Sequence, residues 1–380
     1  MNDRAATLRE LAALFLKLGA TAFGGPAAHI AMMEDEVVGR RKWLTRAEFL
    51  DLLGATNLIP GPNSTEMAIH IGRQRAGWAG LVVAGACFIV PATLIVGVIA
   101  WAYVNYGRLP QAAGLFYGVK PVVFAVVLQA LWQLGRAALE TRALAAVCAA
   151  AVALNLAGVD ELLLLFGAGA LLATHRAVAA GGTRSLPGIF LAGAVAPVAS
   201  GAVPFGLGSL FWFFAKVGSV LFGSGYVLLA FLRADLVERF GWITEAQLLD
   251  AIAVGQMTPG PVFTSATFIG YLLSGAPGAL AATAGIFLPG FVLVAASSPL
   301  IPRLRRRPST AAFLDGVNAA SLALMAVVFL RLFGAAFLDL PTAGIGIGAA
   351  VLLLRFRVNA TWLIAGGALA GVTVYCLRGL

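Results

Sequence analysis

The stretch FLKLGATAFGGP at residues 15–26, with its continuation to PGP at residues 60–62, decides the fold because the chain contains it twice. The second copy reads FAKVGSVLFGSG at residues 214–225 and reaches PGP at residues 259–261. Of the 51 positions that begin at residue 15, 17 are identical to the residue 199 places later, without a gap. After a one-residue gap the shift becomes 198, and further glycines and a proline still coincide. The chain therefore consists of two related halves, which in an apolar chain is typical of secondary transporters.

The composition is that of a membrane protein. Of the 380 residues, 60% are hydrophobic and only 11% are charged, whereas soluble domains carry about 25% charged residues. Long stretches such as residues 76–107 and 275–301 contain no charge, and a membrane-spanning helix needs roughly 20 apolar residues. Because backbone groups in lipid must be hydrogen-bonded within their own segment, we expect an all-α polytopic membrane protein in contact with the lipid bilayer.

The charge and the motifs exclude several other classes of protein. The net charge of +9 is explained by the lysine and arginine that membrane proteins carry in cytoplasmic loops. No basic run is interleaved with aromatic residues, so no nucleic-acid partner is expected. The three cysteines are dispersed, which argues against a disulfide framework and against a metal site. The sequence has no Walker A, HExxH, GxSxG or CxxC motif, so we expect no enzyme, no catalytic residues, no cofactor and no ATP-driven pump.

The chain divides into an N-terminal repeat at residues 1–185, a connecting segment at residues 186–204 and a C-terminal repeat at residues 205–380. Each repeat has six apolar segments, so one additional span in the connecting segment would start the second repeat on the opposite side of the membrane. The charges favour this inverted topology. With a cytoplasmic N-terminus, the loop after the third segment lies outside in the first repeat, with Arg108, and inside in the second, with the four arginines of residues 303–307.

Both repeats are interrupted where their first two apolar segments would otherwise be continuous helices. Gly24-Gly25-Pro26 interrupts the first segment and Pro60-Gly61-Pro62 the second, and the second repeat has Gly223-Ser224 and Pro259-Gly260-Pro261 at these places. Each proline lacks an N–H, and the residue before a proline is pushed out of the helical region. Non-helical backbone within the membrane is tolerated only inside protein or beside water. Each Pro-Gly-Pro segment is therefore either part of a broken span or part of a re-entrant hairpin, and the sequence leaves this open.

The residues after each break are suited to begin a new helix. Asn63, Ser64 and Thr65 follow the first Pro-Gly-Pro, and Thr264 and Ser265 follow the second; such side chains cap helix N-termini. A helix N-terminus presents free N–H groups and partial positive charge, which bind anions. We expect the two breaks to form an anion site near the membrane midplane. The alternative is that proline and glycine only kink two helices.

The few ionisable residues inside the predicted spans are functional candidates. Lys17 and Lys216 are repeat equivalents that either balance the charge of an anion or extend toward the membrane interface. Lys120 and Asn318 are also equivalents, so the two could line one cavity from opposite sides. Glu66 has no carboxylate counterpart in the second repeat. An unpaired carboxylate beside an anion site needs a proton or a cation, which makes Glu66 the candidate for proton coupling.

The spacing of these features resembles the chromate ion transporter (CHR) family in its long-chain, two-domain form. The matching pattern is Gly24-Gly25, twelve residues, Val38, four residues, Trp43, sixteen residues and Pro60-Gly61-Pro62. The second repeat departs from it, because Ser224 stands in place of Gly25. The resemblance implies secondary transport of chromate out of the bacterial cytoplasm, driven by the membrane potential or a proton gradient. It also implies a relation to sulfate, since both are tetrahedral divalent oxyanions.

These expectations place the chain in the bacterial inner membrane as a multi-pass protein. Its expected partners are a chromate- or sulfate-like oxyanion and the lipid bilayer, and a homodimer stays open as its assembly. The rival functions are a transporter or channel for sulfate or another anion, and a membrane scaffold that transports nothing. The sequence leaves undecided the direction of flux, the coupling ion and its stoichiometry.

Overall fold

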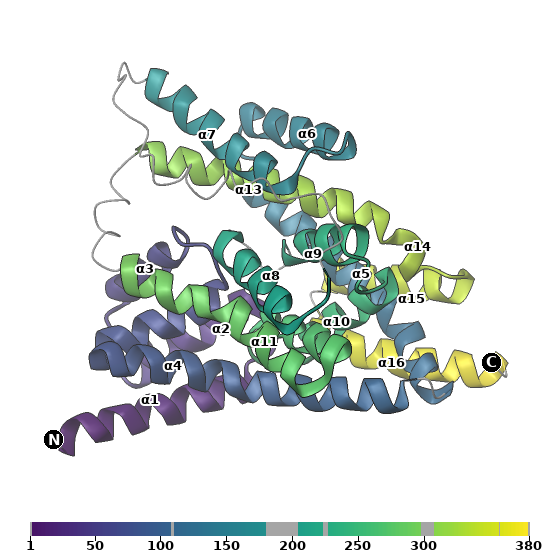
Figure 1. The fold of residues 1–380 in the computed structure, drawn as a ribbon, viewed down its shortest axis with the longest axis horizontal. Coiled ribbons are helices and arrows are strands. Elements are labelled where there is room, and N and C mark those ends of the chain that lie inside the picture. Colours follow the sequence, from purple (N-terminus) through teal and green to yellow (C-terminus); the bar gives the residue numbers. More distant parts are fainter. Residues whose placement is uncertain are drawn as a thin grey trace.

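The structure, a computed structural model, describes residues 2–107, 110–179, 204–222, 227–297, 308–356 and 358–378. Among these residues, six helices are long and apolar enough to cross a membrane, so the prediction of an all-α polytopic membrane protein is confirmed. The helices of the first half are α1 (Asn2–Thr21), α2 (Gly25–Glu34), α3 (Arg46–Thr56), α4 (Asn63–Tyr106), α5 (Pro110–Ala138), α6 (Arg142–Leu156) and α7 (Glu161–Ala179) (Figure 1). Those of the second half are α8 (Leu207–Val220), α9 (Leu228–Leu232), α10 (Glu245–Met257), α11 (Ser265–Ser297), α13 (Pro308–Arg331), α14 (Phe333–Ala336), α15 (Leu340–Phe356) and α16 (Ala360–Arg378). Residues 186–203 of the connecting segment lie outside the described residues, so its additional span stays a prediction.

α4 and α11 are each a hairpin of two helical arms. The backbone of α4 leaves the helical region at Ala76 and at Gly77, which has φ 64°, and α11 does the same at Ser274 and at Gly275, which has φ 60°. Gly72 packs directly on the backbone of Gly80, although residues eight apart in a continuous helix are separated by about 12 Å. The two arms of α4 therefore fold back on each other, at a turn whose positive φ favours glycine.

The two repeats fold alike in detail. π-helical segments at Asp35–Arg40 and Arg233–Arg239 follow α2 and α9, and capping boxes at Thr45 and Thr244 begin α3 and α10. α1 packs on α4, and α8 packs on α11. Each pair approaches closely at one glycine, Gly19 or Gly218, where a Cβ would lie within 3.0 Å of a backbone carbonyl of the neighbouring helix.

The halves interlock, because the last two helices of each half pack on the other half. α15 and α16 pack on α5, whereas α6 and α7 pack on α13. The closest contacts are repeat equivalents: Gly118 of α5 meets Gly367 of α16, and Gly316 of α13 meets Ala168 of α7. In Figure 1, α6, α7 and α13 lie together along the upper edge of the view, and α1 and α4 lie along the lower edge.

The Pro-Gly-Pro segments connect the halves reciprocally. The Gly61 N–H donates to the Leu221 carbonyl at 2.7 Å, and the Gly260 N–H donates to the Ala22 carbonyl at 2.9 Å. Gly260 is the repeat equivalent of Gly61, and Leu221 is the repeat equivalent of Ala22. Each half therefore donates from the same backbone N–H to the same backbone carbonyl of the other half. A twofold relation between two units produces such an exchange. It also satisfies, within the protein, backbone groups that the prolines withdraw from helices.

Candidate functional site

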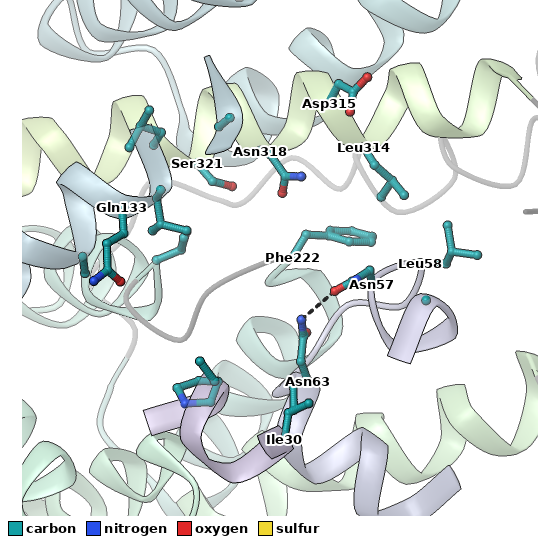
Figure 2. Close-up of a pocket in the computed structure, with 18 of the residues that line it drawn as sticks. Ile30, Asn57, Leu58, Asn63, Gln133, Phe222, Leu314, Asp315, Asn318 and Ser321 are labelled. Carbon is teal, nitrogen blue, oxygen red and sulfur yellow. Dashed lines mark hydrogen bonds between the residues drawn. The ribbon is translucent and has the colours of Figure 1, made fainter. Parts of the chain in front are cut away.

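A cavity of about 770 Å³ lies between the two halves at the first break of the N-terminal repeat. α2 and the end of α3 line one side of it, and α5 and α13 line the other. Phe222, which directly precedes the equivalent break of the second repeat, reaches into the space between them (Figure 2). Small-ligand sites typically measure about 300–1,000 Å³. The cavity therefore has the size of a ligand site, and it brings Phe222 and Val227 of the second repeat to the first break of the N-terminal repeat.

Four side-chain amides give the cavity its chemistry. Asn57 and Asn63 flank the first Pro-Gly-Pro, and Asn63 Nδ2 donates to Asn57 Oδ1 at 3.0 Å. The N–H groups of the Asn57 amide remain without a partner among the described residues, and they are available to a ligand. Asn318 of α13 points across the cavity toward Asn57 (Figure 2), and Gln133 of α5 also lines it.

Two hydroxyl groups of the lining are buried without a partner. Ser321 is 3% exposed and Thr310 is 6% exposed, and neither hydroxyl oxygen has a hydrogen-bond partner among the described residues. Leaving a buried polar group unpaired costs about 1–3 kcal/mol. Both hydroxyls are therefore stabilised by any ligand or water that enters the cavity and bonds to them.

The charged groups around the cavity do not point into it. The described lining contains no lysine or arginine, and the carboxylate of Asp315 points away from the cavity (Figure 2) toward Arg176, at 3.8 Å. Partial positive charge comes from the start of α4, where the first intrahelical bond runs from the Thr65 N–H to the Pro62 carbonyl. No group of three or more His, Cys, Asp or Glu side chains among the described residues could hold a metal ion.

Three of the predicted binding residues line this cavity, namely Gly24, Asn63 and Asn318. Gly24 and Gly25 have φ 103° and 78°, a region that side chains with a Cβ rarely adopt, so the break before α2 depends on glycine. Their equivalents Gly223 and Ser224 lie outside the described residues.

The other predicted residues near the breaks are enclosed by protein. Ser64 and Thr65 are 2% and 1% exposed. Thr264 and Ser265 are fully buried, and their hydroxyls donate to backbone carbonyls three residues earlier at 2.8 and 2.9 Å. Within the Pro-Gly-Pro segments, Pro60 is half-buried, and the remaining residues are buried: Gly61, Pro62, Pro259, Gly260 and Pro261.

Lys17 and Lys216 are paired with carboxylates. Lys17 Nζ lies 2.8 Å from Glu36 Oε1, and Lys216 Nζ lies 2.8 Å from Asp235 Oδ2. The hydrogen bond from Lys17 holds the pKa of Glu36 below its ordinary value. Both carboxylates belong to the π-helical segments, so the two lysines tie equivalent segments to α1 and α8, and neither lysine lines the cavity.

Lys120 does not share the cavity with Asn318. Its Nζ lies 3.3 Å from Asp250 Oδ1, and the Tyr103 hydroxyl donates to Asp250 Oδ2 at 2.9 Å. Asp250 is 3% exposed. This buried cluster joins α4, α5 and α10.

Glu66 is fully buried, and neither carboxyl oxygen has a hydrogen-bond partner among the described residues. The carboxyl group packs against Gly61 and lies near Gly290 of α11. A buried charged carboxylate without a partner is very costly, so the neutral acid is the form that this site stabilises.

Three residues of the lining were not predicted as site residues from the sequence, namely Asn57, Gln133 and Ser321. All three are uncharged polar residues within or beside apolar segments. A search for uncharged hydrogen-bonding side chains in the apolar segments, rather than for charges alone, would have found them.

The described residues thus define a polytopic helical membrane protein of two interlocked repeats, with a cavity between them that several polar side chains line. The family model for the chromate transporter matches residues 9–174 and 208–372, one match in each half. The chain belongs to the chromate transporter family, as its motifs indicated.

Individual relatives match almost the whole chain. It is 33% identical to the chromate transport protein of Cupriavidus metallidurans over 98% of this chain and 94% of the relative. It is 34% identical to the chromate transport protein of Pseudomonas aeruginosa over 97% of this chain and 93% of the relative. No solved structure matches the chain. The relatives are transporters, which points to a protein that is not an enzyme.

Proposed function

We propose that this protein is a secondary transporter that exports chromate from the bacterial cytoplasm. The observation that carries the proposal is the cavity between the halves, which Asn57, Gln133 and Asn318 line with amides. The relatives named as chromate transport proteins support this choice of substrate.

The lining suits an oxyanion whose oxygen atoms only accept hydrogen bonds. A hydrogen bond to a charged group contributes about 1.5–3 kcal/mol, so several amide and hydroxyl donors together hold an anion without a neighbouring cation. The partial positive charge at the start of α4 adds to this attraction. Because no lysine or arginine of the described lining has to be separated from the anion, release remains easy, as transport requires.

The position of the cavity supports loading from the cytoplasm. Thr310 lies in the first turn of α13, directly after the four arginines of residues 303–307. Asp315 pairs with Arg176 near the end of α7. The positive-inside rule assigns these chain segments to the cytoplasm, so an anion that enters here leaves on the other side.

An inverted arrangement of the repeats is part of the proposal. Along the long arm of α4, Leu81 belongs to a small buried cluster with Val294 of α11, and Gly85 packs on Phe291. From Leu81 to Gly85 the residue number rises along α4, whereas the residues of α11 near them fall from Val294 to Phe291. These contacts indicate that the two equivalent arms run antiparallel. Antiparallel equivalents are expected when the axis that relates the halves lies in the membrane plane.

Chromate uptake into inverted membrane vesicles, with and without an imposed proton gradient, tests the function. We expect Asn318→Ala to weaken chromate binding by about 10- to 150-fold, the equivalent of one hydrogen bond to a charge. Asn105→Ala is the matched control, because Asn105 is an exposed amide that donates to its own helix at Trp101. Equal uptake in both variants would reject the cavity as the site. Absence of uptake by the parent protein would reject the transport of chromate itself.

Glu66 is the proposed proton-coupling group. It lies one turn into the helix that begins at the cavity, and its carboxyl group has no hydrogen-bond partner among the residues that the structure describes. We expect Glu66→Gln to abolish the stimulation of chromate flux by a proton gradient and to leave chromate binding in place. Glu10→Gln, at an exposed position of α1, is the control. Unchanged gradient-driven flux in Glu66→Gln would remove this role.

Sulfate is the second candidate substrate, since the neutral lining recognises charge and shape that sulfate shares with chromate. Uptake of labelled chromate in the presence of excess sulfate separates the two. Strong competition together with faster transport of sulfate would make sulfate the substrate.

A further inference from the structure

Because the halves are related, a second cavity is expected at the equivalent position of the other half. Packed helices occupy that position instead. Asn57 and Leu58 line the cavity at the end of α3, and their equivalents 199 residues later are Gln256 and Met257 of α10. Gln256 is only 8% exposed, because α10 packs on α5, α14 and α16. On the cavity side, by contrast, open space lies between the end of α3 and α13.

The facing helices show the same difference. Asn318 and Leu322 of α13 line the cavity, and their equivalents on α5 are Lys120 and Phe124. Lys120 is ion-paired with Asp250 of α10, and Phe124 stacks on Phe329 with 4.0 Å between ring centroids. The two repeats thus enclose one open face and one closed face at equivalent places.

We propose that Tyr103, Asp250 and Lys120 form the gate that closes the outer face, and that the anion leaves when Lys120 separates from Asp250. The proposal rests on the transport function proposed above. Tyr103 lies four residues before Gly107, where α4 ends beside the loop that the charge pattern places outside the cell. The cluster also joins α4 and α5 of one half to α10 of the other, so it holds together elements that must part if the outer face is to open.

The chemistry of the cluster links opening to the arrival of the anion. Separating a buried lysine from a buried carboxylate is costly when neither finds a new partner. An oxyanion that reaches Lys120 supplies the negative charge that Asp250 supplied before. Tyr103 continues to donate to Asp250, so the carboxylate keeps one partner. The anion therefore stabilises the open gate more than the closed gate, which is the condition for a ligand to shift such an equilibrium.

Thiol labelling tests the gate without relying on substrate. In a variant whose Cys87, Cys148 and Cys376 are replaced, Gln256→Cys reports on the closed face and Asn57→Cys reports on the cavity. A membrane-impermeant maleimide is applied to right-side-out vesicles for Gln256→Cys and to inverted vesicles for Asn57→Cys. We expect Asp250→Asn to raise the labelling rate of Gln256→Cys by about 5- to 150-fold and to lower that of Asn57→Cys.

Asp339→Asn is the matched control, because the Tyr117 hydroxyl also donates to Asp339, and Arg378 pairs with it. None of the three residues of this second tyrosine, carboxylate and cation cluster belongs to α10, so Asp339→Asn should leave both labelling rates unchanged. Lys120→Gln removes the other partner of the gate and should act like Asp250→Asn. It also provides the test if Asp250→Asn fails to insert.

The outcomes separate the gate from the transport function. Unchanged labelling of Gln256→Cys in both gate variants would overturn the gate, even if the parent protein transports chromate. Faster labelling of Gln256→Cys together with slower labelling of Asn57→Cys would support it, even if another anion proves to be the substrate. An equal increase at both positions, or the same effect from Asp339→Asn, would show general loosening and would also overturn the gate.

Discussion

Substituting Gly61 by alanine perturbs the contact between the first Pro-Gly-Pro and Glu66. Gly61 has φ 140°, and a Cβ there would lie within 3.0 Å of Glu66 Oε1. Two separate penalties are expected. Forcing a residue with a Cβ into such a backbone conformation costs about 1–3 kcal/mol, and displacing the end of the buried Glu66 side chain costs up to about another 3 kcal/mol. We expect Gly61→Ala to lower the free energy of unfolding by about 1–6 kcal/mol in total.

Gly77→Ala is the control that separates these penalties. Gly77 also has a positive φ, 64°, but a Cβ there would meet no atom within 4 Å. It should therefore show only the backbone penalty of about 1–3 kcal/mol. Thermal unfolding of the purified protein in detergent, followed by circular dichroism, should rank the melting temperatures as parent, then Gly77→Ala, then Gly61→Ala.

A double-mutant cycle identifies the clashing atom. In the background of Gly61→Ala, Glu66→Ala removes the carboxyl group and should recover about 1–3 kcal/mol relative to its effect in the parent, since directly contacting residues couple by about this amount. Equal melting temperatures for Gly61→Ala and Gly77→Ala, or strict additivity with Glu66→Ala, would refute the packing of Glu66 on the break.

Two further predictions concern the interlocked helices and the ionisation of Asp339. Gly118→Ala should destabilise the protein by about 1–3 kcal/mol, because its Cβ would lie within 3.0 Å of the backbone of α16. Gly366→Ala is the control, because its Cβ would meet no described atom within 4 Å, and it should be neutral or stabilising by up to about 1 kcal/mol. Melting temperatures of the two variants test this difference. The Tyr117 hydroxyl, the Thr342 backbone and Arg378 lower the pKa of Asp339 to about 2. The contribution of Asp339 to stability is then complete above about pH 4 and is lost as the pH falls toward 2, so the difference in melting temperature between the parent and Asp339→Asn should shrink over that interval.

Much of the fold could be predicted because duplication leaves a direct record in the sequence. The helix interruptions at Gly24 and at both Pro-Gly-Pro segments were predicted correctly from equivalent glycines and prolines. Glycine and proline are the residues that most readily interrupt a helix. The interlocking of the halves could not be predicted. The contact of Gly118 with Gly367 joins small residues almost 250 positions apart, and glycine spacing within one helix does not identify its partner.

The candidate site was predicted only in part, for a physical reason. Asn63, which follows the first Pro-Gly-Pro, and Asn318 do line one cavity, but Lys120, the repeat equivalent of Asn318, is paired with Asp250 instead. Lys17 and Lys216, chosen for their charge, are paired with Glu36 and Asp235. A charged lysine within an apolar segment needs a negatively charged partner, and sequence alone cannot distinguish a protein carboxylate from a bound anion as that partner.

The differences between the repeats matter as much as their similarity. Two identical halves in an inverted arrangement would make the inward-open and outward-open states equal in energy. Here the first repeat has Lys120 and Phe124 where the second has Asn318 and Leu322. Lys120 makes an ion pair and Phe124 makes an aromatic stack, and neither interaction is possible for the asparagine or the leucine. Under the transport function and the gate proposed above, the empty protein should therefore rest with its outer face closed and its cavity open to the cytoplasm. In that scheme an anion that binds the cavity and then pairs with Lys120 has to overcome this bias, and substitutions at two positions of a duplicated sequence are enough to produce it.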